Sequence, residues 1–129
     1  MSKPYLITSA LPYVNNVPHL GNIIGSVLSG DIYARYCKLL GRPTFYLSGT
    51  DQCGTTTEMK AKQEKISCQE LCDKYHKLHK DIYDWFNIQF DVFGQTTNKV
   101  QTKITQDIFL ELDKNKHIEK KDTKQYYCK

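Results

Sequence analysis

The hydrophobic positions follow two different periods along the chain, and this pattern predicts an α/β fold. Residues 5–9 are rich in β-branched and apolar side chains on both faces, which predicts a buried strand at the centre of a sheet. Apolar residues then recur at helical spacing from His19 to Leu40, with Pro18 at the helix start and Gly41 just past its end. A second buried strand is predicted over residues 44–48. A strand, a helix and a strand in this order form a βαβ unit with parallel strands.

The remaining pattern predicts three more helices and one more strand. A polar helix is expected near residues 58–65, and a third strand over 90–93 is expected to end at Gly94. Ser67 with Glu70 can form a capping box for a longer helix. The apolar stripe predicted for that helix consists of Leu71, Tyr75, Leu78, Ile82 and Trp85.

The last predicted helix begins at Asn98, whose side chain can cap it together with Gln101. Its apolar positions are Val100, Ile104, Ile108 and Leu112, and the helical pattern is lost near Asn115. Residues 118–129 are too few to fold alone.

Size and composition favour one soluble domain. The chain has 129 residues, of which 40% are hydrophobic and 25% are charged. No apolar run approaches the roughly 18 residues that a membrane span needs, so no membrane partner is expected. The amino terminus lacks the apolar core of a signal peptide. The five cysteines are odd in number and lack paired spacings, which favours free thiols and a cytoplasmic location.

Charge adds little about partners. The net charge is +4, and residues 99–129 hold eight Lys against five acidic residues. This bias is compatible with a nucleic-acid partner but is too mild to indicate one.

The turn after the first strand, residues 10–22, carries the candidate chemistry. Ligands of open parallel sheets gather at the carboxyl ends of the strands, where the next helix offers free N–H groups to a phosphate. His19 and Asn22 lie three residues apart on one helical face, so both can reach the same phosphoryl group. Gly21 leaves the backbone open to a ligand. An alternative is that His19 only caps the helix or packs at its start.

The same residues carry a family resemblance. His19-Leu20-Gly21-Asn22 resembles the HIGH signature of class I aminoacyl-tRNA synthetases and departs from it at Asn22, whose amide can still donate a hydrogen bond. The string from Ile7 to Asn22 resembles methionyl-tRNA synthetases of the eukaryotic cytosolic type. The similarity continues through residues 49–55, 72–76, 85–88 and 101–109.

The resemblance implies the first half of a class I synthetase Rossmann-like nucleotide-binding fold, a parallel sheet with flanking helices that is cut before it is complete. Residues 1–120 would form the amino-terminal half of the catalytic domain, and residues 121–129 would begin the inserted connective region. Cys128 would belong to the first half of a zinc knuckle there, without its partners. No metal is therefore expected in this chain.

The resemblance also implies methionine–tRNA ligase activity. The methionine carboxylate would attack the α-phosphorus of ATP, with Mg²⁺ present, and the aminoacyl group would pass to tRNA(Met). His19 and Asn22 would be catalytic. The residues implied to bind ATP are Pro18, His19, Gly21 and Asn22, and those implied to bind methionine are Ala10, Leu11, Tyr13 and Asp51. Alternatively, Leu11 and Tyr13 belong to the core and Asp51 only caps the next turn.

Two other functions stay open. The chain could be a nucleotide- or tRNA-binding module without catalysis, or a small nucleotidylyltransferase that uses His19 and Asn22 on another substrate. Without the second half of the fold, we expect these 129 residues alone not to activate methionine.

One cluster on the longer predicted helix could suggest zinc. Cys68, Cys72, His76 and His79 lie on one side of it. The first and last are separated by a helical rise of roughly 16 Å, so the four cannot share one ion. They are expected to form a half-buried flank of the helix.

Overall fold

A three-stranded parallel sheet forms the centre of the fold. The computed structural model describes residues 3–124 and 126. Strands β1 (Tyr5–Thr8), β2 (Thr44–Thr50) and β3 (Val92–Gln95) lie in the order β1-β2-β3. Ile7 is paired with Tyr46, and Ser48 with Phe93. The predicted βαβ unit and its parallel strands are confirmed.

Two predictions about the strands are wrong. β1 pairs only with β2 among the described residues and lies at an edge of the sheet, so its Leu6 is 67% exposed. Gly94 lies inside β3 and does not end it. The two strands approach closely there, because a Cβ added to Gly49 would lie 2.5 Å from the carbonyl oxygen of Gly94.

The helical run after β1 is continuous but changes its pitch. It consists of α1 (Leu20–Asn22), the π-helical segment η1 (Ile23–Leu28) and α2 (Ser29–Leu39). Gly41 follows the helix end as predicted, with φ +67°, the left-handed conformation that glycine commonly adopts there. Pro18 and His19 precede the first helical turn, so the run begins later than predicted.

Tertiary hydrogen bonds explain the wider π turn. The Tyr46 hydroxyl donates to the carbonyl of Val27 at 2.7 Å, and the Ser9 hydroxyl lies 3.2 Å from the carbonyl of Ser26. The two hydroxyls lie 2.7 Å apart, and since each has one proton, Ser9 donates either to the Ser26 carbonyl or to the Tyr46 hydroxyl. Carbonyls of η1 therefore lie within hydrogen-bond distance of side chains from β2 and from the residue that follows β1.

Helices α3 (Thr55–Glu64) and α4 (Cys68–Trp85) follow β2. The capping box of α4 is confirmed, since Ser67 Oγ accepts from the Glu70 N–H and Glu70 accepts from the Ser67 N–H. The predicted apolar stripe is partly wrong, because Trp85 is 78% exposed. The buried residues of α4 are Leu71, Cys72, Tyr75, His79 and Tyr83.

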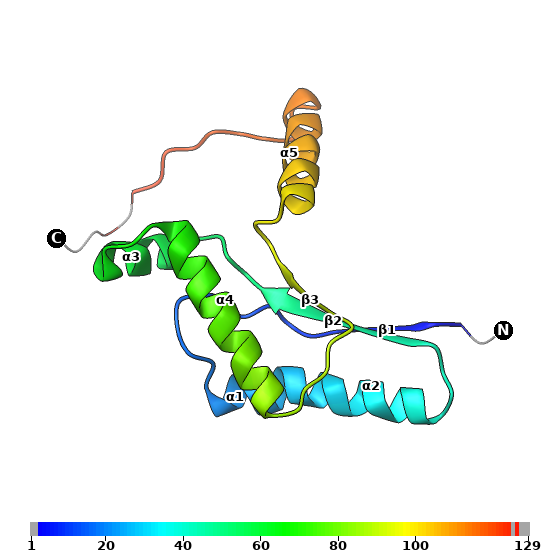
Figure 1. Ribbon diagram of the computed structural model, residues 1–129. Helices are drawn as coiled ribbons and strands as arrows, with labels where there is room; N and C mark the ends of the chain where they lie inside the picture. Colours follow the sequence, from blue (N-terminus) through cyan, green and yellow to red (C-terminus); the bar gives the residue numbers. More distant parts are fainter. Residues whose placement is uncertain (1–2, 125, 127–129) are drawn as a thin grey trace. The chain divides into compact units, whose positions relative to one another are not determined.

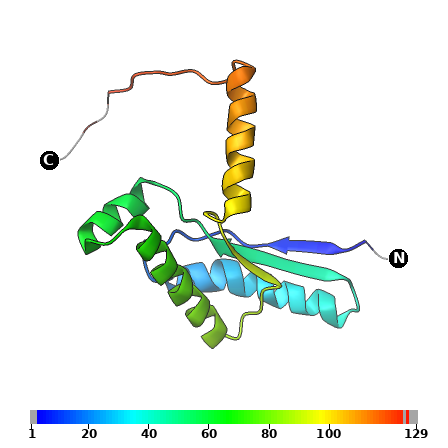
Figure 2. The ribbon, with the colours of Figure 1, turned by 45° about the horizontal axis from the view of Figure 1, so that its top comes forward.

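Helices α2 and α4 lie on the same face of the sheet (Figures 1 and 2). Their buried side chains enclose Tyr46 of β2, together with Ile23, Val27, Ala34, Tyr83 and Ile88. The apolar side chains exposed on the strands include Leu6, Phe45 and Val92. Within this unit, the sheet therefore has one covered face and one face that leaves apolar side chains exposed.

The chain divides into two compact units, residues 1–97 and 98–129. The second contains α5 (Lys99–Lys114), whose N-cap Asn98 accepts from the Gln101 N–H as predicted, and which ends before Asn115. Its predicted apolar stripe is confirmed as helical but is exposed to solvent. None of the helices described is long and apolar enough to cross a membrane. The predicted boundary at residue 120 stays a prediction.

Candidate active site at the end of strand β1

The loop between β1 and α1 divides into two segments that are held in different ways. We name residues 10–14 the strand-end segment and residues 15–22 the helix-start segment. The strand-end segment is held by backbone hydrogen bonds to the end of β2: the Val14 N–H donates to the Asp51 carbonyl at 3.2 Å, and the Asp51 N–H donates to the Pro12 carbonyl at 2.9 Å. It continues the parallel pairing beyond β1, with Tyr13 opposite Asp51.

The helix-start segment is closed by a reciprocal cap. The Asn22 N–H donates to His19 Nδ1, and the His19 N–H donates to Asn22 Oδ1, both at 3.3 Å. His19 therefore does cap the helix, which was the alternative raised for it from the sequence. Because Ser, Thr, Asp and Asn are the usual capping residues, a histidine in this role is uncommon.

The cap leaves donors free on both side chains. His19 Nδ1 accepts a hydrogen bond, so the neutral ring carries its proton on Nε2. Asn22 accepts through Oδ1, so its amide N–H groups remain available. Both residues are exposed. The cap and the binding of an anion are therefore compatible.

Gly21 makes room for the imidazole of His19. A Cβ at this position would lie 3.0 Å from His19 Cε1 and 3.1 Å from Nδ1. The absence of a side chain at Gly21 therefore allows the imidazole of His19 to lie where it does. It also leaves the backbone open to a ligand.

Asp51 follows β2, and its side chain is half-buried. Its Oδ1 accepts from the Cys53 N–H at 3.2 Å, which is the turn cap considered from the sequence. A carboxylate has a second oxygen, so this turn and a ligand cation can be bound by the same group. Leu11 and Tyr13 are 44% and 54% exposed, which excludes the alternative that they belong to the core.

Most of the predicted site residues line two adjoining hollows. One, of about 270 Å³, is lined by Tyr13, Pro18, His19 and His79 among others. The other, of about 190 Å³, is lined by Ala10, Leu11, Ser26 and Val27. Pro12 and Asn22 line both. The residues predicted for ATP and for methionine therefore meet at Asn22, which lines both hollows, and in the first hollow, where Tyr13 lies with Pro18 and His19. Gly21 and Asp51 line neither hollow.

Two histidines of α4 contact this region, and both were interpreted from the sequence only as a flank of the helix. His79 is 1% exposed, and its Nε2 lies 2.8 Å from the carbonyl oxygen of Asn16. His76 Nδ1 lies 2.8 Å from Thr50 Oγ1, next to Asp51. Burial lowers the pKa of both imidazoles. The spacing of Leu71, Tyr75, His79 and Tyr83 could have identified His79 as buried.

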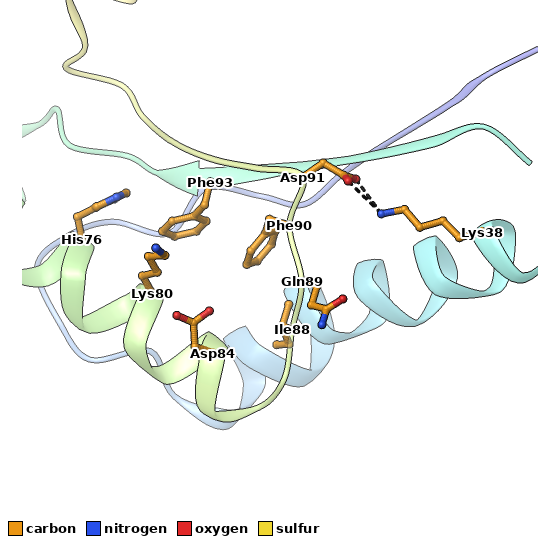
Figure 3. Close-up of a pocket in the computed structure, with 9 residues that line it drawn as sticks. All are labelled: Lys38, His76, Lys80, Asp84, Ile88, Gln89, Phe90, Asp91 and Phe93. Atoms are coloured by element: carbon orange, nitrogen blue, oxygen red, sulfur yellow. Dashed lines mark hydrogen bonds and ion pairs between the residues drawn. The ribbon is translucent and has the colours of Figure 1, made fainter.

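A larger hollow of about 570 Å³ lies apart from the predicted site residues (Figure 3). His76, Lys80 and Asp84 of α4 line it together with Phe90 and Phe93. Lys38 and Asp91, which form an ion pair at 3.0 Å, also line it. Its size alone does not indicate a function.

The four cysteines described, Cys37, Cys53, Cys68 and Cys72, are free thiols as predicted. Burial raises the pKa of Cys72 to about 11, so this thiol is protonated and is a poor metal ligand. The described residues contain no group of three or more His, Cys, Asp or Glu that could hold a metal ion. Cys128, predicted to belong to a zinc knuckle, lies outside the described residues.

Comparison with known proteins identifies the family. The model of the family "tRNA synthetases class I (M)" matches residues 5–129. A methionine–tRNA ligase of Borrelia duttonii is 56% identical over 128 residues, which are 99% of this chain and 18% of that protein. Cytoplasmic methionine–tRNA ligases of Caenorhabditis elegans and Saccharomyces cerevisiae are 61% and 59% identical over 123 residues, or 13% and 16% of their lengths. The chain thus spans less than a fifth of each of these relatives.

A solved structure shows the same fold. The methionyl-tRNA synthetase of Mycobacterium tuberculosis in complex with methionyl-adenylate superposes with a TM-score of 0.81 at 25% identity, covering 88% of this chain and 22% of that one. Sequence and structure agree over nearly all of the chain. The chain therefore belongs to the methionyl-type class I tRNA synthetases.

Proposed function

We propose that this chain is an amino-terminal part of the catalytic domain of a methionine–tRNA ligase. In the first step, a carboxylate oxygen of methionine attacks the α-phosphorus of ATP, and pyrophosphate leaves. In the second step, the ribose hydroxyl at the tRNA(Met) terminus attacks the aminoacyl carbonyl, and AMP leaves. The observation that carries this proposal is the meeting of both groups of predicted residues at Asn22.

In this proposal the helix-start segment binds the ATP phosphates. His19 Nε2–H and the Asn22 amide donate to phosphate oxygens, where they stabilise the charge that develops at the attacked phosphorus. The first turn of the helix adds the positive end of its dipole. Pro18 and Gly21 lie beside these donors in the helix-start segment, where Gly21 has no side chain to keep a phosphate away from the backbone.

The strand-end segment binds methionine. Ala10, Leu11 and Tyr13 provide an apolar wall for the thioether, which needs polarisable contacts more than hydrogen bonds. The free oxygen of Asp51 pairs with the substrate ammonium. The known complex of the Mycobacterium tuberculosis relative with methionyl-adenylate supports a site that holds both substrates side by side.

The wider assignment follows from the same relatives. We propose that residues 1–120 belong to the catalytic domain and 121–129 to the start of a connective region, and that the enzyme acts in the cytoplasm, as the cytoplasmic relatives do. Mg²⁺ would accompany the ATP phosphates, since this ion is usually bound through substrate phosphates and waters. No step above depends on a metal held by this chain.

Methionine-dependent exchange of pyrophosphate into ATP tests the proposal. The test protein is an intact ligase in which this segment stands in place of the matching 123 residues of the Saccharomyces cerevisiae ligase. We expect exchange only when methionine is present. Nucleotidyl transfer that does not depend on methionine would favour the nucleotidylyltransferase alternative, and ATP or tRNA binding without exchange would favour a binding module.

A further inference from the structure

His79 makes a specific contact with the helix-start segment. Its ring is 1% exposed, and Nε2 lies 2.8 Å from the carbonyl oxygen of Asn16. A carbonyl can only accept a hydrogen bond, so Nε2 carries the proton and donates. The same imidazole lines the hollow that His19 and Asn22 line.

This contact compensates for a lack of backbone support. The strand-end segment is bonded to β2 on both sides of Tyr13. Between Asn15 and Pro18, in contrast, the bond from His79 is the one hydrogen bond that the described residues supply from outside the loop. Asn16 precedes His19 by three residues, so the contact lies close to the start of the capped turn.

The chemistry of the ring indicates a role beyond packing. In the Nε2–H tautomer, Nδ1 is an acceptor, and it is buried without a partner among the described residues. A buried acceptor left unpaired is destabilising. An apolar ring would fill the same space without this cost, so the bond to Asn16 is the property that distinguishes histidine here. Burial also lowers the pKa of His79, which keeps the ring neutral.

We infer that His79 is a positioning residue for ATP: through the carbonyl of Asn16, it holds the helix-start segment where His19 and Asn22 can reach the phosphates. This inference rests on the proposed function. It assigns to α4 a direct part in positioning the helix-start segment, which binds the phosphates in the proposed function. It further requires that loss of the contact affects ATP and leaves methionine binding, which depends on the backbone-bonded segment, nearly unchanged.

The test compares His79→Phe with His79→Gln in the intact ligase. Phenylalanine keeps the volume of the ring and removes the donor, whereas the glutamine amide places an N–H near the position of Nε2. We expect His79→Phe to raise the KM for ATP in pyrophosphate exchange by about ten- to a hundredfold, because small misplacements of binding groups have effects of this size. The KM for methionine should change by less than about threefold, and His79→Gln should recover most of the loss.

Tyr83→Phe is the matched control. Tyr83 lies one helical turn further along α4, is 1% exposed, and has a hydroxyl without a partner among the described residues. Removing this hydroxyl changes the same buried face without touching the loop, so both KM values should stay as in the wild type. Hydrogen exchange should show faster exchange of the backbone amides of residues 15–22 in His79→Phe and not in Tyr83→Phe.

Several outcomes would overturn the inference. His79→Phe with an unchanged KM for ATP, or with equal rises in both KM values, would show that the contact does not position the phosphate end. Should His79→Phe fail to fold, His79→Asn replaces it, since its shorter amide does not reach Asn16; equal KM values for ATP in the Asn and Gln variants would then contradict the role. Wild-type ligase that shows no methionine-dependent exchange would refute the proposed function instead.

Discussion

The two segments of the candidate site differ in what holds them. Residues 10–14 are bonded through their backbone to the end of β2, and their side chains make none of these bonds. Residues 15–22 have no backbone hydrogen bond to β2 among the described residues, and apart from the backbone bonds of the first helical turn they are held by side chains, namely the cap between His19 and Asn22 and the bond from His79. The exposed side chains of the first segment, Leu11 and Tyr13, can therefore change without moving the loop. In the second segment, the proposed catalytic side chains of His19 and Asn22 also form the helix cap that holds them in place.

This difference decides how substitutions must be designed. An alanine at His19 removes a phosphate donor and a helix cap together, so its effect has two causes. An alanine at the exposed Leu11 or Tyr13 of the strand-end segment has one cause. Variants that separate the two roles are the sharpest tests of the comparison.

The largest effect is expected from the loss of the His19 donor. In His19→Ser the hydroxyl keeps the cap, since serine is a good N-cap residue, but no donor reaches the phosphate. We expect kcat/KM for ATP in pyrophosphate exchange to fall by about 10²–10³, the loss typical of a donor that stabilises transition-state charge. His19→Ala should lose as much activity and about 1 kcal/mol of stability in addition. A serine variant with wild-type exchange would show that capping is the only role of His19.

A somewhat smaller effect is expected at Asp51. Asparagine keeps the Oδ1 that accepts from the Cys53 N–H and removes the charge. We expect the KM for methionine to rise by about ten- to a hundredfold, as for the loss of a hydrogen bond to a charged group, while the KM for ATP and the melting temperature stay unchanged. A lower melting temperature with an unchanged KM for methionine would show that Asp51 only stabilises its turn and does not bind methionine.

A third prediction concerns the helical run that supports both segments. A Cβ at Gly30 would lie 2.6 Å from the Tyr46 hydroxyl and 2.7 Å from Ser9 Oγ, two groups that are bonded to each other. Gly30→Ala should therefore lower the free energy of unfolding by about 1–3 kcal/mol in chemical denaturation. Gly25, five residues earlier, has nothing within 4 Å of an added Cβ, and Gly25→Ala is the control expected to keep or raise stability.

The smallest effect is expected from pH. Burial lowers the pKa of His76 and His79 below the unfolded value near 6.5, so protonation favours the unfolded chain. Their stabilisation is present above about pH 6.5 and is lost as the pH falls below it. Glu64, Glu70 and Asp91 have lowered pKa values as well, and their contributions are lost only near pH 4 and below.

The melting temperature should therefore fall between about pH 7.5 and pH 5.5, before the carboxylates contribute. His79→Gln should reduce this dependence, because glutamine does not titrate. A flat profile in the wild type over this interval would contradict the assigned direction of the histidine pKa shifts.

Local rules explain which parts of the fold could be predicted from the sequence. The caps at Ser67 and Asn98 and the helix end at Gly41 depend on residues within a few positions of one another, and all three were predicted. The parallel pairing of β1 and β2 follows from the connecting helix. The predicted site residues other than Asp51 are close in sequence on one loop, so most of them could be found together.

The remaining features depend on contacts between distant segments. The π turn exists where hydroxyls of Ser9 and Tyr46 lie within hydrogen-bond distance of carbonyls of η1, and helical periodicity carries no sign of that. Gly94 continues a strand because Gly49 lies against it. His79 contacts Asn16 across 63 positions of sequence. Its helical spacing with Tyr75 and Tyr83 could indicate burial, but the loop that it contacts could not be predicted.

Isothermal titration calorimetry of the intact ligase with ATP and with methionine tests the central claim most directly. The claim is that the helix-start segment binds phosphates and the strand-end segment with Asp51 binds methionine. We predict that His19→Ser weakens ATP binding and keeps methionine binding, and that Asp51→Asn does the reverse. Unchanged binding of both substrates in the double variant His19→Ala/Asp51→Ala would contradict the assignment of this loop.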